Sequence, residues 1–287
     1  LGQLQLELER LGAANSTFQY AQFDNVYVSK EGTIISEHNC QHAVRHSACD
    51  STGYIYMSSS NVTRREQDLV ISLASRYGHA TWHFAAEGFS SLAAMPKELL
   101  KTARIHVSRK NAWVMSWLEL AGIRPDQVVQ GSIRAQQLLA PRTAKCGSPD
   151  LNHFRYMASV AAAATPSIED NPAQRNTVLY VKRTKRTVHD DSELVKVMSD
   201  WAKAQNKLLV IHDDQNLPKT LQAQLERFAQ ASVVVGPHGA GLTLLAASRP
   251  GTCVIEWQDP KYMNPCFFRM AYFLRHLYIS IPMVQWV

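Results

Sequence analysis

The turn whose residue types most clearly suggest a binding site follows a run of β-branched residues in the second half of the chain. Residues 232–235 predict a buried strand, followed at once by Gly-Pro-His-Gly-Ala-Gly at 236–241 and then by an apolar helical pattern. Small residues let a ligand approach the backbone, and the first N–H groups of a helix point outwards with the positive end of its dipole. The turn therefore indicates an anion site, to which the hydroxyl of Thr243 could add a donor.

A cluster of positive charges follows an earlier predicted strand. Residues 182–186 read Lys-Arg-Thr-Lys-Arg directly after an apolar run. Because ligands of a doubly wound sheet bind at the carboxyl ends of its strands, this cluster and the glycine-rich turn should share one edge of the sheet. Their coincidence favours a phosphate site over the simpler alternatives, a solvated basic surface and a turn that needs glycine only for packing.

Neither feature matches the common nucleotide motifs. The turn lacks the Lys-Ser/Thr ending of a P-loop and the GxGxxG spacing of dinucleotide sites, which weakens ATPase and dehydrogenase interpretations. The chain has no DxD motif of the kind that ligates Mn²⁺; its adjacent acidic pairs are Asp190-Asp191 and Asp213-Asp214.

Composition limits the class of protein. The chain has 287 residues, 46% hydrophobic and 19% charged, which is typical of a folded protein. This length favours two domains of about 130 to 150 residues. The net charge of +6 favours anionic partners, namely nucleotides, nucleic acid or acidic glycans. The longest apolar runs, such as 156–164, are too short for a membrane span, and because the chain opens on Leu1, we expect that an anchoring segment could have preceded it.

Strand and helix patterns alternate along the first half, which predicts an α/β domain with a parallel sheet. The expected strands are 25–29, 32–36, 53–58, 103–108 and 126–131, and the expected helices are 66–78, 82–95 and 111–122. Residues 140–150 are rich in helix and strand breakers. We place the domain boundary near residue 165, which gives domains of 1–165 and 166–287.

The second half alternates more regularly and predicts a doubly wound domain. The expected strands are 176–183, 207–213, 232–236 and 251–258, and the expected helices are 190–206, 217–231, 240–249 and 264–277.

The order of these elements resembles the C-terminal signature of glycosyltransferase family 61, which includes plant xylosyltransferases and the extracellular O-GlcNAc transferase. The resemblance rests on VVVGPHGAGLTLLAASRPGTCVIEW with VLYVKRTKRTVHDDSELVKVM upstream, and covers residues 178–281. Residues 82–96 are similar, more loosely, to the family's aromatic-His segment. Leu244 stands where an Asn commonly follows HGAGLT, which puts any polar contact there in doubt.

The resemblance implies a GT-B fold, with two Rossmann-like domains facing across a cleft, and an inverting, commonly metal-independent transferase with no cofactor besides its nucleotide-sugar co-substrate. It implies that Arg183 and Arg186 meet the diphosphate, where forked guanidinium donors suit phosphate oxygens. The rest of the expected donor site comprises the backbone amides of Gly239, Ala240 and Gly241, the side chains of His238 and Thr243, and Glu256 for the ribose hydroxyls. A solvated carboxylate is the alternative for Glu256.

An inverting transfer also needs a base that deprotonates the acceptor hydroxyl. His83 and Glu87 lie four residues apart, on one face if residues 81–89 are helical, and such a pair could orient the imidazole and raise its basicity. The alternative is a histidine that only packs beside the aromatic residues Trp82 and Phe84.

The sequence therefore predicts a glycosyltransferase, with a UDP sugar as donor by family habit and a glycan or glycoprotein as acceptor. A non-catalytic nucleotide- or glycan-binding protein of the same fold is the alternative. A nucleic-acid partner has no supporting motif. For a eukaryotic protein we expect the Golgi or ER lumen.

Cysteine usage bears on that compartment. Cys40 and Cys49 bracket a segment with two histidines, but no paired ligand spacing of a zinc site is present. A Cys40–Cys49 disulfide is favoured if the protein is secretory, and the sequons at Asn15 and Asn61 are compatible with that location.

Overall fold

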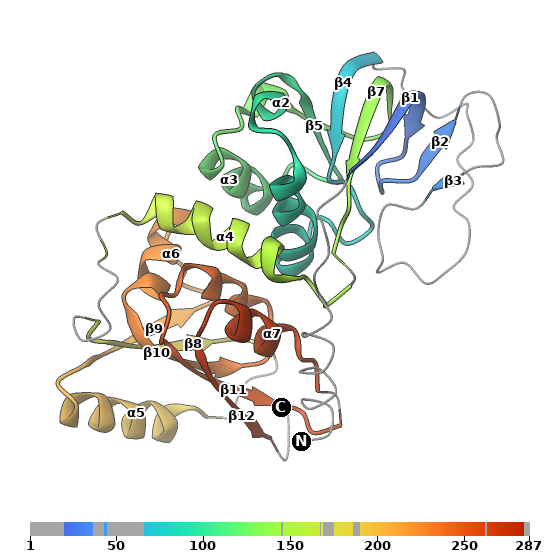
Figure 1. The fold of residues 1–287 in the computed structure, drawn as a ribbon. Helices are drawn as coiled ribbons and strands as arrows, with labels where there is room; N and C mark the ends of the chain where they lie inside the picture. The colour runs from blue at the N-terminus through green and yellow to red at the C-terminus, as the bar shows by residue number, and fades with distance from the viewer. Residues whose placement is uncertain are drawn as a thin grey trace. The chain divides into compact units, whose positions relative to one another are not determined.

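The computed structural model describes residues 20–36, 43–44, 66–144, 146–166, 168, 175–185, 190–261 and 263–283. Contacts divide the chain into two compact units, residues 10–156 and residues 157–287, which we call the N-terminal and C-terminal units. The division by contacts falls at Met157, inside the helix α4 (Leu151–Ala164), whereas the sequence places the domain boundary near residue 165. Both units are of the α/β type, as the sequence predicts (Figure 1).

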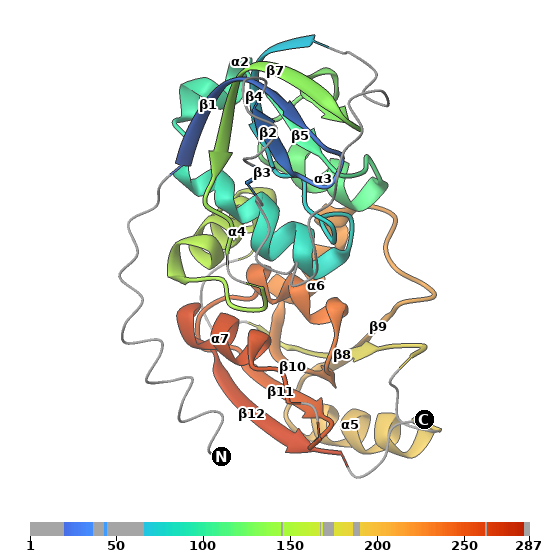
Figure 2. The ribbon, with the colours of Figure 1, turned by 90° about the vertical axis from the view of Figure 1, so that its right-hand side faces the viewer.

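The C-terminal unit is built on a five-stranded sheet in which every pair of neighbours is parallel. Its strands are β8 (Thr177–Lys182), β9 (Leu208–Asp213), β10 (Ala231–Pro237), β11 (Cys253–Gln258) and β12 (Leu277–Pro282). Its helices are α5 (Ser192–Ala204), α6 (Leu221–Ala229), the 3-10 helix η6 (Ala240–Ala247) and α7 (Cys266–Phe273). Figures 1 and 2 show α5 on one face of this sheet and α6 and α7 on the other, so the prediction of a doubly wound unit is confirmed.

The strand order places a switch point inside this sheet. The order is β12-β11-β10-β8-β9, so the chain moves outwards in one direction from β8 to β9 and in the other from β10 to β12. The loops after β8 and β10 therefore diverge at their shared edge, and such a point is where open α/β sheets bind ligands. β8 lies between β10 and β9 and its first five residues are buried, as expected of a strand covered on both faces.

Two elements of this unit differ from the sequence prediction. The α-helix predicted over 240–249 is a 3-10 helix that ends at Ala247. The helix predicted over 264–277 ends at Phe273, and a further strand, β12, begins at Leu277. Arg275 adopts a positive φ of 62° between them. Because this reversal uses no glycine, the sequence does not mark where the helix ends.

The N-terminal unit contains a seven-stranded sheet in the order β3-β2-β1-β7-β4-β5-β6. Its strands are β1 (Tyr20–Val28), β2 (Ile34–Ser36), β3 (Ala43–Val44), β4 (Glu66–Ser72), β5 (Arg104–Val107), β6 (Val128–Gln130) and β7 (Ile133–Pro141). Pairs β4–β5 and β5–β6 are parallel, whereas β1 pairs antiparallel with both β2 and β7. The sheet is therefore mixed. The prediction of a parallel sheet is wrong for the part formed by β1, β2 and β3, whose pairs are antiparallel. The predicted strand 53–58 lies outside the described residues.

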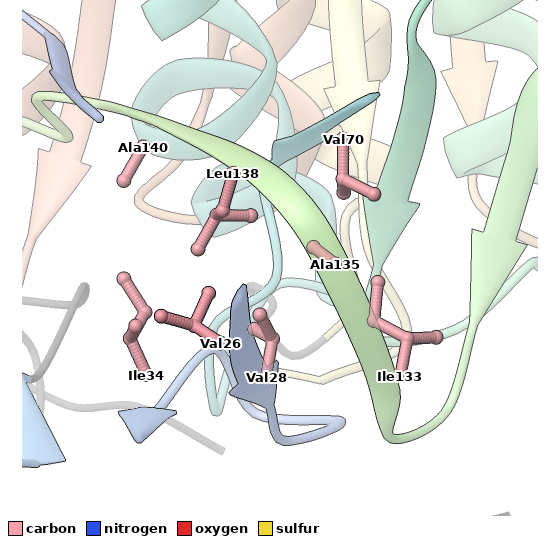
Figure 3. Close-up of a cluster of buried hydrophobic side chains, with 8 residues drawn as sticks. All are labelled: Val26, Val28, Ile34, Val70, Ile133, Ala135, Leu138 and Ala140. Atoms are coloured by element: carbon pink, nitrogen blue, oxygen red, sulfur yellow. The ribbon is translucent and has the colours of Figure 1, made fainter. Parts of the chain in front are cut away.

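The largest error of the sequence prediction concerns β4. Residues 66–78 match a helical spacing of apolar side chains, yet 66–72 form a strand. Val70 and Ile71 are fully buried, and a strand buried on both faces has a continuous apolar run that periodicity cannot distinguish from a helix. Val70 packs in a core with side chains of β1, β2 and β7 (Figure 3): Val26, Val28, Ile34, Ile133, Ala135, Leu138 and Ala140.

The segment predicted as a helix over 82–95 is helical but not α-helical. It consists of a π-helix, η2 (His83–Gly88), followed by a 3-10 helix, η3 (Phe89–Ala94). Single π turns are rare and occur frequently at functional sites. The remaining helices of the unit are α2 (Lys97–Thr102), α3 (Ala112–Leu120) and the 3-10 turn η4 (Pro125–Gln127). The helices within the described ranges are all too short or too polar to span a lipid bilayer.

Candidate active site

The glycine-rich turn and the first arginine of the basic cluster meet at the switch point of the C-terminal unit. Arg183 directly follows β8, and its Nη1 donates a hydrogen bond of 2.7 Å to the carbonyl oxygen of His238, in the turn after β10. The His238 N–H in turn donates to the Trp257 carbonyl at 2.8 Å, which ties the turn to β11. A guanidinium has five N–H donors and this bond uses one of them.

At each glycine of the turn a neighbouring side chain leaves no room for a Cβ atom. A Cβ on Gly239 would overlap the guanidinium of Arg183, and Gly239 also has a φ of +156°. A Cβ on Gly236 would lie 2.9 Å from the Cβ of Val181, and one on Gly241 would lie 2.9 Å from its Cγ1. The glycines thus let the turn lie directly against the end of β8. Packing and anion binding both use this closeness, and the arginine over Gly239 adds the charge.

His238 is held from behind by a buried carboxylate. Its Nδ1 lies 2.5 Å from Oε1 of Glu256, which is near the end of β11. The Glu256 residue is 0% exposed, and the His238 side chain is 12% exposed. Because a carboxylate only accepts hydrogen bonds, Nδ1 carries the proton, and the imidazole directs its other nitrogen away from Glu256. Sequence reasoning placed Glu256 against the ribose; the structure instead brings it to His238, and any contact with the ribose stays a prediction.

Two residues that sequence reasoning missed complete this arrangement. The Tyr278 hydroxyl, from β12, donates to Oε2 of Glu256, and the side-chain amide of Gln258 donates to the same oxygen at 3.3 Å. The spacing of Glu256 and Gln258, two apart on one strand, could have placed them on the same face of the sheet. Tyr278 gave no signal, because no strand was predicted after the helix expected at 264–277.

The other members of the predicted donor site are less informative. Thr243 is fully buried and its Oγ1 has no hydrogen-bond partner among the described atoms. Arg186 lies outside the described residues. Lys182 donates to Asp191 at 3.0 Å, and Asp214 accepts from both the N–H and the hydroxyl of Thr184 at 3.0 Å. Asp214 therefore fixes the loop that begins with Arg183. The roles of these residues in binding stay predictions.

In the N-terminal unit, the predicted pair of His83 and Glu87 does form. Nδ1 of His83 lies 2.8 Å from Oε2 of Glu87. The opposite carboxylate oxygen, Oε1, accepts from the indole N–H of Trp82 at 3.0 Å and from the backbone N–H of Gly147 at 2.7 Å. The Glu87 side chain is 7% exposed and that of His83 is 30% exposed. Glu87 is thus a fixed, buried acceptor beneath an accessible imidazole.

This geometry specifies what the imidazole can do. A proton on Nδ1 that is donated to Glu87 leaves Nε2 as the basic nitrogen of the neutral ring. The ring of Tyr77, on the segment after β4, lies 5.4 Å from the His83 ring and limits its movement. The arrangement matches a general base that is oriented by a carboxylate. Neither Trp82 nor Gly147 was predicted as a contact, and Gly147 lies 60 residues from Glu87 in the sequence.

His83 and Glu87 also approach Cys146, and one ligand atom from each lies within 4.8 Å of the others. Histidine, carboxylate and thiolate are zinc ligands, but Cys146 is disulfide-bonded and so offers no thiolate. Cys253 and Cys266 are free. Cys40 and Cys49 lie outside the described residues, so the disulfide predicted between them stays a prediction.

Comparison with known proteins identifies the family. The model of the family described as glycosyltransferase 61 matches residues 81–255 of this chain. The chain belongs to glycosyltransferase family 61. The matched residues run from the aromatic-His segment through β8 and the glycine-rich turn into β11, so His83, Arg183 and His238 all lie within the family 61 region.

A similar protein occurs in rice. The chain is 29% identical over 119 residues to the protein named β-1,2-xylosyltransferase RCN11 of Oryza sativa subsp. japonica. The match covers 37% of this chain and 22% of the rice protein. The chain thus matches about a fifth of its relative's length, and the similarity supports the family 61 assignment without transferring the rice protein's substrates.

Proposed function

We propose that this member of family 61 is an inverting, metal-independent glycosyltransferase that moves a sugar from a UDP sugar to a hydroxyl group of a glycan or glycoprotein. The observation that carries the proposal is the meeting of Arg183 with the glycine-rich turn at the switch point of the C-terminal sheet. A pentose is the first sugar to test, because the name of the rice relative is that of a xylosyltransferase.

In this proposal the C-terminal unit binds the donor. The amide N–H groups of Gly239, Ala240 and Gly241 begin a helix and have no acceptors within its first turn, so they can donate to phosphate oxygens. Arg183 and the imidazole of His238 add side-chain donors at the same turn. Negative charge grows on the leaving diphosphate as its bond to the sugar breaks, and fixed donors stabilise that charge most when they are already in place.

His83 is the proposed base. The acceptor oxygen attacks the anomeric carbon and forms the new glycosidic bond, while the bond from that carbon to the diphosphate oxygen breaks. The acceptor proton passes to Nε2 of His83, and Glu87 stabilises the imidazolium that results. In the GT-B arrangement that we propose, the N-terminal unit supplies this base and the C-terminal unit supplies the donor.

The disulfide at Cys146 supports the proposal of a Golgi or ER location. Disulfides persist in oxidising compartments and are rare in the cytosol. In the lumen of these compartments the chain would meet glycoproteins, which are among the acceptors that we propose.

The proposal is tested first by nucleotide binding. We expect UDP to raise the melting temperature of the wild-type protein, and GDP, CMP and ATP to raise it less, since a ligand that binds the folded state alone stabilises it. Transfer from UDP-xylose, UDP-GlcNAc and UDP-arabinofuranose to glycan acceptors is then measured by mass spectrometry of the products. Binding of UDP without turnover of any sugar would favour a non-catalytic binding protein. Absence of binding by every nucleotide would contradict the donor site.

Transfer is expected to continue in the presence of EDTA. Arg183, His238 and the turn amides provide positive charge and donors for the diphosphate, so a divalent cation is not required to neutralise it. The rate of sugar transfer should be measured after EDTA treatment and after addition of Mn²⁺. A rate that depends strictly on Mn²⁺ would contradict this part of the mechanism.

A further inference from the structure

A continuous set of hydrogen bonds lies behind His238. The Glu256 carboxylate accepts from His238 through Oε1, and from the Tyr278 hydroxyl and the Gln258 amide through Oε2. The same amide nitrogen of Gln258 lies 2.8 Å from the Tyr278 hydroxyl oxygen, to which it donates. The side-chain carbonyl oxygen of Gln258 accepts from the backbone N–H of Asn264 at 3.0 Å. The set therefore joins four segments: the turn after β10, the end of β11, β12 and the loop that leads into α7.

The buried position of the Glu256 carboxylate is not explained by stability alone. Glu256 is 0% exposed and Gln258 is 1% exposed. Burying a carboxylate removes it from water at a large cost in solvation free energy, and apolar side chains of similar volume often stabilise a fold as well or better. The member that reaches the edge of the sheet is His238, with a side chain 12% exposed. The hydrogen bonds of the set thus lead from the interior to one accessible imidazole.

We infer that Tyr278 and Gln258 are positioning residues for donor binding: they fix the Glu256 carboxylate, which holds Nδ1–H of His238 and directs Nε2 to the diphosphate. The inference rests on the proposed function. It also gives Glu256 a role different from contact with the ribose.

The surroundings of Tyr278 fit this role. Burial, together with the neighbouring Glu256 carboxylate, raises the pKa of the Tyr278 hydroxyl above its ordinary value, so the hydroxyl keeps its proton and donates. The ring is held by Phe268 of α7, with ring centroids 5.5 Å apart in an edge-to-face arrangement. Phenylalanine would keep this ring packing and remove only the hydrogen bond.

Tyr278→Phe is therefore the decisive variant, and the chain offers a matched control. Tyr180 is also buried and its hydroxyl also donates to a carboxylate, that of Asp191 at the start of α5. Tyr180→Phe and Tyr278→Phe should lower the melting temperature by similar amounts. By titration calorimetry, we expect the affinity for UDP to fall about tenfold in Tyr278→Phe, as a hydrogen bond to a charged group is lost, and less than about twofold in Tyr180→Phe.

A double-mutant cycle tests the route through the imidazole. If Tyr278 acts through His238, then Tyr278→Phe should change UDP affinity less than about twofold when His238 is already alanine. Full additivity of the two losses would overturn the inference, and so would equal UDP affinities of the wild type and a folded Tyr278→Phe protein.

A measurement without nucleotide separates this inference from the proposed function. The ring ¹⁵N signals of His238, assigned by their loss in His238→Ala, should report a proton on Nδ1 in the wild type and should shift in Tyr278→Phe. Unchanged signals would overturn the positioning role even if UDP binds. If the wild type binds no UDP while the His238 signals differ between the wild type and Tyr278→Phe, the proposed UDP site is overturned and the positioning of His238 by Tyr278 stands.

Discussion

Replacing Arg183 with alanine is expected to remove nearly all binding of the UDP donor while the protein remains folded. The guanidinium lies over Gly239 and donates to the His238 carbonyl, so it places a positive charge directly against the turn. Two hydrogen bonds to a charged phosphate contribute about 3 kcal/mol, which corresponds to about a hundredfold in affinity. Lysine should recover little of it, because an ammonium group lacks the planar fork.

Titration calorimetry with UDP measures the loss directly, and thermal unfolding monitors the fold. Lys196→Ala is the matched control, since Lys196 is exposed on α5 of the same unit and its loss changes the net charge by the same amount. Affinity that falls equally in both variants would indicate a general electrostatic effect. Affinity that is unchanged in Arg183→Ala would remove this residue from the donor site.

The position of Arg183 could be predicted from the sequence because it depends on a short-range rule. Each parallel strand of the C-terminal unit is a recognisable apolar run, and the residue that follows it must lie at one edge of the sheet. The order of helices and strands then brings the loops after β8 and β10 together at the switch point. No side-chain contact has to be known for this step.

The contact of Glu256 with Tyr278 could not be predicted, because it depends on where a helix ends and the next strand begins. The apolar spacing of 264–277 continues without a glycine or proline after residue 265, and the reversal occurs at Arg275, which adopts a positive φ. The strand that carries Tyr278 was therefore hidden. The β4 strand was missed for a related reason, since its buried residues Val70 and Ile71 are consistent with either period.

The pair of His83 and Glu87 shows how far spacing can lead. Four residues of separation bring two side chains to one face of an α-helical turn, and the contact also forms in this π-helix. The burial of Glu87 and the hydrogen bonds that it accepts from Trp82 and Gly147 arise from tertiary packing, so no sequence pattern predicts them.

These contacts matter for the function, because they distinguish two histidines with similar partners. His83 and His238 each place Nδ1 on a glutamate, but His238 belongs to the turn that Arg183 covers, and His83 lies in the other unit. Loss of His238 should therefore weaken donor binding, and loss of His83 should not. The two effects can be measured separately on the same protein.

His83→Ala is expected to lower the rate of sugar transfer by about 10² to 10⁴ while the affinity for UDP stays within about twofold of the wild type, as expected when a general base is removed. Glu87→Gln should also slow transfer, because a side-chain amide can donate to Nδ1 and so favour the tautomer with its lone pair on the wrong nitrogen. Single-turnover rates and UDP titration separate the two readouts. His79→Ala is the control, a neighbouring histidine outside the pair. If His83→Ala lost transfer and UDP binding together, His83 would be a packing residue; if its transfer rate were unchanged, the base would have to be sought elsewhere.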